Sequence, residues 1–180
     1  MPELSIFKSL APYHIISYGT LLGTEFFQTF VGGIVSYQAL PRPQFSQLQQ
    51  KLFPVYFGLQ TAFPAILALT YPGSKLLGIQ SGLQGVLADT WGALFPIATI
   101  FVTSLANWAI IGPATTSIMR ERKHQETRDG KKYYDQGPHS EEMNKLNSAF
   151  SSMHGLSSLL NLAGFIMTCW YGVSLAERIQ

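Results

Sequence analysis

Charged residues are scarce in this chain of 180 residues. Lys, Arg, Asp and Glu make up 12% of it, about half of their share in a typical soluble domain. Cys169 is the single cysteine, which excludes a disulfide scaffold and a four-cysteine zinc site. Few charges together with 13% aromatic residues exclude a disordered chain. A net charge of +2 gives no indication of nucleic-acid binding.

The motifs of common soluble enzymes are missing as well. The sequence has no Walker loop, no G-x-G-x-x-G after a strand, no G-x-S-x-G and no H-E-x-x-H. No set of acid, base and nucleophile is recognisable either, so a membrane enzyme ranks third among the possible functions. We therefore expect no catalytic site, no cofactor and no metal.

The few charges are distributed unevenly. Of the 22 charged residues, 13 lie within 120–145. Glu25 and Asp89 are the only charged residues in four long stretches, which are 9–41, 52–74, 76–119 and 146–176. A bilayer span needs roughly 20 mostly apolar residues, whereas a helix of a soluble protein normally has one polar face. The distribution therefore predicts an all-α membrane protein.

We expect one membrane domain, 1–180, with four transmembrane helices in an antiparallel bundle. The predicted spans cover about 14–38, 52–71, 88–112 and 147–175, and a charged loop covers 113–146. The prolines of Pro41-Arg42-Pro43 end the first span, because proline has no N–H to donate. Asp89 is expected to cap the third span. Residues 73–87 and 128–140 are expected to be loops, the second one flexible.

The basic residues predict the orientation of the spans. With four spans, Lys8, Lys75 and Arg178 lie on one side of the membrane. The other side holds nine, namely Arg42, Lys51, Arg120, Arg122, Lys123, Arg128, Lys131, Lys132 and Lys145. Cytoplasmic loops carry the excess of Lys and Arg. The loop 113–146 is therefore predicted to be cytoplasmic.

Three blocks of residues carry a family resemblance. The first comprises QTFVGG at 28–33, LPR at 40–42 and QKLFPVYF at 50–57; the second is Asn107 with Pro113 and TTSIM at 115–119; the third is FSSMHGLSSLLNL at 150–162. With these blocks the chain resembles the transmembrane protein 205 family of small four-span proteins. The resemblance implies a multi-pass endomembrane protein linked to secretion and to resistance to toxic compounds. It implies no established reaction and no catalytic residue.

Polar residues within the predicted spans are the candidates for function, because polar groups in a bilayer are costly and normally face the bundle interior. They form a candidate intramembrane polar layer of Glu25, Gln28, Gln60, Asn107, His154 and Asn161. The amides are expected to hold helices together through hydrogen bonds. Glu25 is interpreted as a neutral carboxyl bonded to an amide, or as a proton- or cation-coupled group. His154 is interpreted as part of a tight helix contact, or as a proton or metal site.

Small residues indicate close helix packing. Gly19 and Gly23 form a G-x-x-x-G pair in the first span, a pattern that lets two helices approach closely. The further candidates for helix packing are Gly32, Gly33, Gly155 and Ser158. Tyr71 and Tyr171, near span ends, are expected to belong to the aromatic belt at the membrane surface.

Two functions remain open. The preferred one is a structural, accessory or trafficking-related membrane component with a dry, hydrogen-bonded polar layer. The alternative is a small transporter or channel for protons, metal ions or small solutes, with a water-filled cavity. The expected partners are membrane lipids and other membrane subunits or a second copy of the chain, but not nucleic acid. We expect an endomembrane of the secretory pathway, with a mitochondrial membrane as the other possibility.

Overall fold

The computed structural model describes residues 9–73 and 80–177. Helices account for 87% of these residues, and no β-strand occurs in the two ranges. The prediction of an all-helical chain is therefore confirmed. Lys8, Lys75 and Arg178, which entered the orientation argument, lie outside the described residues.

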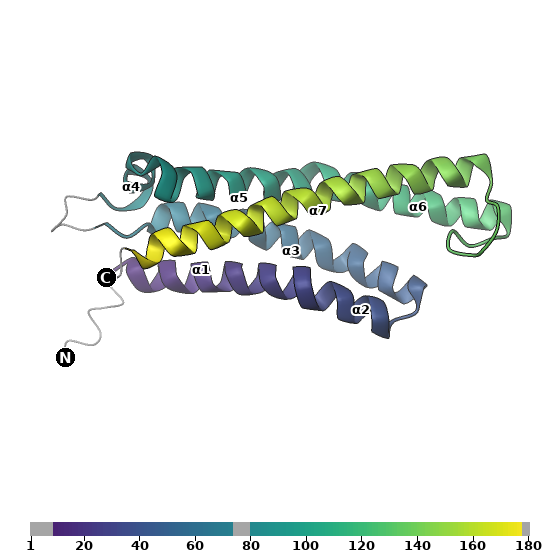
Figure 1. The fold of residues 1–180 in the computed structure, drawn as a ribbon, viewed down its shortest axis with the longest axis horizontal. Coiled ribbons are helices and arrows are strands. Elements are labelled where there is room, and N and C mark those ends of the chain that lie inside the picture. The colour runs from purple at the N-terminus through teal and green to yellow at the C-terminus, as the bar shows by residue number, and fades with distance from the viewer. Residues whose placement is uncertain (1–8, 74–79, 178–180) are drawn as a thin grey trace.

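Long helices run side by side along the molecule (Figure 1). In chain order the helical elements are α1 (Ala11–Phe26), the π-helix η2 (Phe27–Gly32), α2 (Gly33–Ala39), α3 (Arg42–Thr70), α4 (Gly82–Ala88), the π-helix η3 (Thr90–Leu94), α5 (Phe95–Ala106), the π-helix η4 (Asn107–Ile111), α6 (Gly112–Asp129) and α7 (Glu141–Ala176). The start of α1, all of α4 and the end of α7 lie together at what we call the terminal end. The α2–α3 turn and the α6–α7 connection lie at the opposite, loop end.

Three of the helical stretches are long and apolar enough to cross a bilayer. They are Arg42–Thr70, Thr90–Asp129 and Glu141–Ala176. At most 39% of the most apolar window of each stretch is buried within the protein, so most of its apolar surface faces outward. The predicted span 14–38 is helical as well, but η2 divides it into α1 and α2, of 16 and 7 residues.

The prolines expected to end the first span follow the last residue of α2, Ala39, and they also mark the start of the next helix. Pro41 directly precedes α3, whose first turn holds Pro43. The Asp89 carboxylate accepts a hydrogen bond from Gly92 N at 3.0 Å, which confirms the predicted cap. The loop expected over 73–87 is only partly correct, because its last residues form α4.

The loop expected over 128–140 is confirmed for residues 130–140, whereas 128 and 129 still belong to α6. Gly130 ends α6 with a φ of 64°, a left-handed conformation that glycine adopts without strain. The hydroxyl of Ser140 donates to Asp129 Oδ2 at 2.7 Å and accepts from Met143 N at 3.1 Å, which caps α7. Side-chain bonds on both sides of the turn thus hold the α6–α7 connection in one conformation.

Arg122 completes this packing. Its guanidinium lies over the Tyr133 ring at 3.8 Å and over the Phe150 ring at 4.5 Å, which places a residue of the connection and one of α7 around a side chain of α6. The neighbouring Glu126 accepts from Tyr133 N at 3.2 Å and from Lys123 Nζ at 2.8 Å. Arg122 and Glu126 are only 8% and 5% exposed, so the charged run is not simply a solvated helix face.

An apolar core occupies the terminal half of the interior. Its buried residues are Leu21, Leu67, Tyr71, Val86, Ala93, Ile97, Ile100, Tyr171 and Leu175. Tyr71 and Tyr171 are 0% and 1% exposed, so the expectation that they lie in an aromatic belt is wrong. Four helical segments close around their rings, and the rings pack in the interior instead of facing lipid headgroups.

The glycines predicted to pack helices do not do so within this chain. A Cβ atom added to Gly19, Gly23 or Gly155 would meet no atom within 4 Å. At Gly32 and Gly33 it would meet only atoms of the same helical stretch, those of Phe27 and Gln28. Ser158 is exposed, and its hydroxyl donates to the carbonyl of His154 at 2.8 Å. A contact of these residues with another chain stays a prediction.

Other glycines allow the close approaches. A Cβ on Gly172 would collide with the Tyr18 hydroxyl, and one on Gly164 would lie 3.2 Å from Thr103 Oγ1. A Cβ on Gly85 would collide with the backbone carbonyl of Gln80. Whether a glycine lies at a contact between segments therefore depends on which side of its helix faces inward, and not on the G-x-x-x-G spacing.

The same substitution at two glycines tests this arrangement. Gly85→Ala is expected to lower the free energy of unfolding by about 1–3 kcal/mol, because backbone has to move to make room for the methyl group. Gly155→Ala is expected to raise it by about 0.4–1 kcal/mol, because alanine loses less backbone entropy in a helix. Thermal unfolding in detergent, followed by circular dichroism, measures both. Equal effects of the two variants would contradict the packing described for α4.

Candidate functional site

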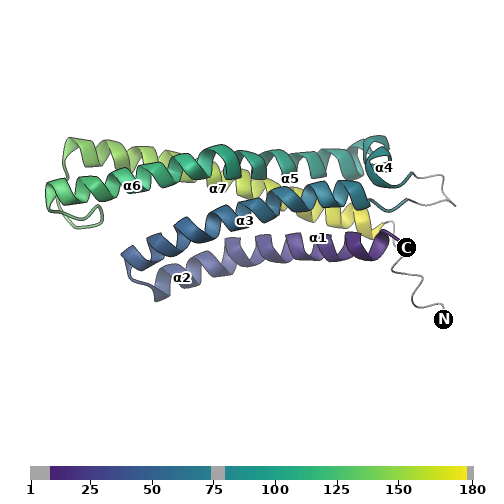
Figure 2. The same ribbon diagram turned by 180° about the vertical axis from the view of Figure 1, so that it is seen from behind.

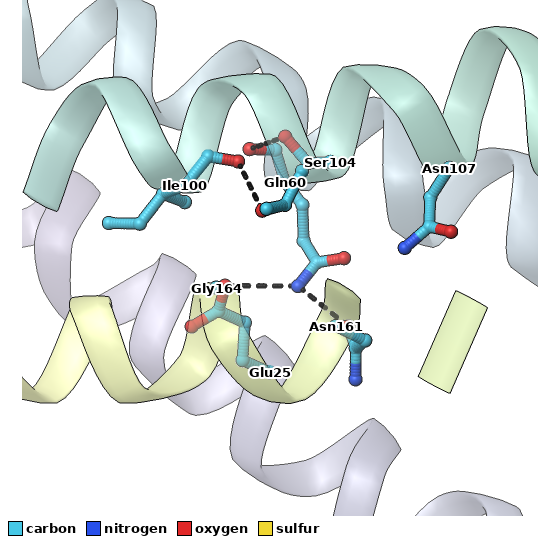
Figure 3. Close-up of a pocket in the computed structure, with 8 residues that line it drawn as sticks. Glu25, Gln60, Ile100, Ser104, Asn107, Asn161 and Gly164 are labelled. Carbon is cyan, nitrogen blue, oxygen red and sulfur yellow. Dashed lines mark hydrogen bonds between the residues drawn. The ribbon is translucent and has the colours of Figure 1, made fainter. Parts of the chain in front are cut away.

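A small buried cavity lies midway along the helices, where polar side chains from five helical segments converge (Figure 3). It is lined by Glu25, Gln60, Ile100, Thr103, Ser104, Asn107, Asn161 and Gly164. The space between these side chains is too narrow to hold a water molecule. The structure thus brings together four of the six residues of the predicted polar layer, one each from α1, α3, η4 and α7.

Gln60 is the centre of this cluster. Its Nε2 donates to Glu25 Oε1 at 2.9 Å and to Asn161 Oδ1 at 3.1 Å, as Figure 3 shows. Glu25 and Gln60 are 0% and 3% exposed. One amide group therefore joins α1 and α7 through α3, and each of its two hydrogens reaches a different helix.

Tyr56 and Thr29 extend the cluster toward the loop end. Tyr56 donates to Asn161 Oδ1 at 2.8 Å. The Asn161 amide donates in turn to Thr29 Oγ1 at 2.9 Å. Asn161 thus uses both its donor and its acceptor groups on side chains of α3 and η2. Such interhelical bonds are each worth about 0.6–2 kcal/mol in a bilayer.

A proline inside α3 creates a further link. Pro64 has no N–H, so the carbonyl of Gln60, four residues earlier, has no partner within its own helix. The hydroxyl of Ser104 on α5 donates to this carbonyl at 3.1 Å. The proline therefore converts a bond within α3 into a bond between α3 and α5.

Two buried polar atoms in the cluster lack partners. Glu25 Oε2 and Asn107 Oδ1 make no hydrogen bond with the described residues, although Asn107 Nδ2 donates to the carbonyl of Ser157 at 3.2 Å. Both residues adjoin π-helical turns, since η2 begins two residues after Glu25 and η4 begins at Asn107. Single π-helical turns within α-helices occur frequently at functional sites.

Gln28 and His154 are not part of this cluster. Gln28 lies half-buried in η2, and its Nε2 is buried without a hydrogen-bond partner. His154 is exposed on α7, and its ring stacks on that of Phe150 with 5.6 Å between centroids. His154 lies about 10 Å along the helix axis from Asn161, which is too far along α7 for its ring to reach the cluster. Within the described residues, no group of three His, Cys, Asp or Glu is placed to hold a metal ion.

A second buried cluster at the terminal end surrounds His14. This histidine, the first residue of the predicted span 14–38, is 0% exposed. Its Nε2 lies 2.6 Å from Tyr171 OH, and its Nδ1 lies 3.0 Å from Thr70 Oγ1. Thr70 gives its one hydroxyl hydrogen to the carbonyl of Ile66, so it accepts from His14 Nδ1–H. His14 Nε2 then accepts from Tyr171, which describes a neutral ring that joins α1, α3 and α7.

Sequence reasoning missed several members of the central cluster. They are Thr29, Tyr56, Thr103, Ser104 and Gly164. Each lies three or four residues from a polar residue that was predicted, as Tyr56 does from Gln60 and Gly164 from Asn161. Residues at this spacing share a helix face, and this signal would have identified them.

The comparisons with known proteins identify the family of this chain. A family model described as "Domain of unknown function (DUF4149)" matches residues 16–124. The chain is 30% identical over 170 residues to "Transmembrane protein 205" of Danio rerio, and the match covers 84% of each protein. The chain belongs to the transmembrane protein 205-like family. With the three apolar helices, this membership identifies it as a membrane protein.

A second relative comes from a fungus. The chain is 32% identical over 176 residues to "Xanthocillin biosynthesis cluster protein D" of Aspergillus fumigatus, with 98% of this chain and 95% of the relative covered. No solved structure matches the chain. The family resemblance found in the sequence is confirmed by the match to transmembrane protein 205, which covers 84% of the chain.

The Gln60 bonds lead to a direct prediction about stability. Gln60→Leu is expected to lower the free energy of unfolding by about 1–3 kcal/mol, because it leaves Glu25 Oε1 buried without its donor and removes one of the two hydrogen bonds that Asn161 Oδ1 accepts. Gln38→Leu, at an exposed position of α2, serves as the control for the same change in side chain. Unfolding titrations in mixed micelles measure both variants. If the two lost equal stability, Gln60 would not be holding the helices together.

Proposed function

We propose that the protein is a structural or accessory component of a membrane assembly and has no catalytic site. The observation that carries this proposal is the central polar cluster. Its side chains bond to one another across four helical segments, around a space too narrow for water. A pathway for a solute needs polar groups that face a water-filled cavity. Groups that bond to each other in a dry interior support the packing of helices instead.

The outer surface supports a role beside other proteins. Gly19 and Gly23 lie uncovered on α1, where their lack of side chains leaves a flat surface. In bilayers such surfaces allow a helix of another subunit to approach closely. The occurrence of a relative named for a biosynthesis cluster is in keeping with an accessory role next to enzymes. The partner would be another membrane subunit or a second copy of this chain.

We further propose that the chain crosses the membrane four times as a single antiparallel four-helix domain. The helical residues of α1, η2 and α2 extend over about 40 Å, which exceeds the 30 Å or so of a hydrocarbon core. Phe26, Phe27, Ile34 and Val35 on this stretch are all more than half exposed, as expected for side chains that contact lipid. The loop end, which carries most of the basic residues, would face the cytoplasm in an endomembrane.

A transporter or channel for protons, metal ions or small solutes is the second candidate. The observation in its favour is the pair of buried atoms without hydrogen-bond partners, Glu25 Oε2 and Asn107 Oδ1. Unpaired polar atoms in hydrocarbon are costly, and they are often found where a ligand binds.

A topology experiment distinguishes four spans from three. Glycosylation acceptor sites are inserted either before Ser9 or near Gln136 in the α6–α7 connection, and the protein is synthesised in the presence of microsomes. With four spans and a cytoplasmic loop end, only the site before Ser9 is expected to be glycosylated. If α1, η2 and α2 did not cross the membrane, both sites would lie on the same side and would be modified alike.

Flux measurements test the accessory role. Purified protein in liposomes is expected to conduct protons and metal ions no faster than protein-free liposomes, because no water-filled path passes the central cluster. Glu25→Gln should behave like the unchanged protein. A flux that the unchanged protein supports and Glu25→Gln abolishes would favour the transporter.

A further inference from the structure

Glu25 occupies an unusual position for an acidic residue. It is 0% exposed, and none of the other residues around its cavity is a lysine, arginine or histidine. The titratable groups near it are Tyr18 on α1, Tyr56 on α3 and Cys169 on α7, which are uncharged in their protonated forms. The lining residues of α5 do not titrate. A carboxylate here would be a buried charge without a counter-charge, which costs several kcal/mol.

The hydrogen bonds indicate where a proton would sit. Glu25 Oε1 accepts from Gln60 Nε2 at 2.9 Å, so this oxygen acts as an acceptor. Glu25 Oε2 has no hydrogen-bond partner. A buried acid without a counter-charge binds a proton and becomes neutral, and the geometry leaves Oε2 for that proton.

The interior on the two sides of Glu25 differs sharply. Toward the terminal end, the helices are sealed by apolar side chains, with Leu21 and Leu67 at 0% exposed and Ile100 at 1%. Beyond them, the His14 and Tyr171 pair closes the terminal end. Buried hydroxyl groups occur in this layer at Ser17 and Thr168. Thr168 lies beside Glu25, but its hydroxyl donates to the Gly164 carbonyl of its own helix at 3.1 Å, so its hydrogen does not link Glu25 to the His14 and Tyr171 pair.

Toward the loop end, buried amide groups lack partners instead. Gln49 on α3 is 6% exposed, and neither its oxygen nor its nitrogen is hydrogen-bonded. Gln28 Nε2, Asn107 Oδ1 and Asn147 Oδ1 are buried without partners as well. Gln49, Gln28 and Asn147 lie on the loop-end side of Gln60, Glu25 and Asn161 along their own helices, and Asn107 lies three residues beyond Ser104 toward the same end. Buried polar groups without protein partners bind water, so these amides mark the half of the protein that water can enter.

The α2–α3 pair also separates from the α6–α7 pair at the loop end (Figure 2). On α7, the exposed residues of this region include Ser151, His154 and Ser158, which are three or four residues apart and therefore share one face. Polar side chains in the spanning part of a helix are normally turned toward protein or water. This face continues the line of polar groups from the loop end toward Asn161.

We propose that Glu25 is a proton-binding site that exchanges its proton with the loop-end side of the membrane only. The ligand is a proton, and the carboxyl group of Glu25 holds it. Gln60 orients that carboxyl group, while Gln49 and Gln28 lie along the hydrated route. The proposal goes beyond the accessory function, and it requires no transport, because the apolar layer closes the other side.

Labelling with dicyclohexylcarbodiimide tests it. The carboxyl O–H of a protonated acid adds across one C=N bond of this membrane-permeant reagent, and the adduct rearranges to a stable N-acylurea that mass spectrometry locates. Full-length protein is reconstituted into sealed liposomes with different pH values inside and outside. After quenching, trypsin added outside cleaves the α6–α7 connection at exposed residues such as Lys132 only in molecules whose loop end faces outward. Cleaved and intact molecules thus report the two orientations separately.

We expect Glu25 to be labelled, with a yield that follows the pH on the loop-end side and falls by up to about tenfold per pH unit in the alkaline range. Glu25→Gln should remove the label. Gln49→Leu should slow labelling several-fold, whereas Ser17→Ala, on the sealed side of α1, should leave its rate unchanged. Labelling that followed the pH at the terminal end, or that ignored both pH values, would overturn the proposal. Protection of Glu25 by Na⁺ at constant pH would overturn it in favour of a metal cation.

Discussion

The relative placement of the helices depends on the hydrogen bonds of Gln60. In hydrocarbon, no solvent takes over the hydrogen bonds of a polar group that loses its protein partner. The side chain of Gln60 reaches α1 and α7, and its backbone carbonyl reaches α5. A slide of any of these helices by one turn would separate at least one such pair. The cluster therefore sets the register of helices whose lipid-facing surfaces are too uniform to set it.

The interior has two unlike halves on either side of this cluster. In the terminal half, apolar packing and the neutral His14–Tyr171 pair exclude water. In the loop half, buried amides such as Gln49 have no protein partner. Helix packing in a membrane gains little from the hydrophobic effect, because lipid tails are as apolar as the core. Close packing in one half and hydrogen bonds at the centre supply the cohesion that permits a more polar half beyond them.

Much of the fold and part of the site could be predicted from the residues. Long charge-free stretches locate the helices, and Glu25, Gln60, Asn107 and Asn161 meet because a costly polar group in a span has to turn inward. The rotation of each helix about its axis could not be predicted, because apolar residues occur on every side of it. For this reason Gly19 and Gly23 lie outward while Gly164 and Gly172 lie inward.

The contacts of the α6–α7 connection could not be predicted from the sequence, for a different reason. Its composition, rich in charge and glycine, is typical of a mobile loop. The order arises from long-range contacts, with Arg122 stacked between Tyr133 and Phe150, and no local pattern announces a stacked arginine. The burial of His14 could not be predicted either, because its position near the end of a predicted span is typical of a residue at the membrane surface.

The ordered connection has a mechanical consequence. Because Asp129, Ser140 and Arg122 fasten the turn to both helices, α6 and α7 form one stiff arm that extends past the α2–α3 turn (Figure 1). A protein that bound the α6–α7 connection would displace both helices together. Asn107 in η4 and Asn161 in the middle of α7 lie toward the other end of these two helices. A tilt of α6 and α7 at their connection would therefore move these two side chains of the polar cluster.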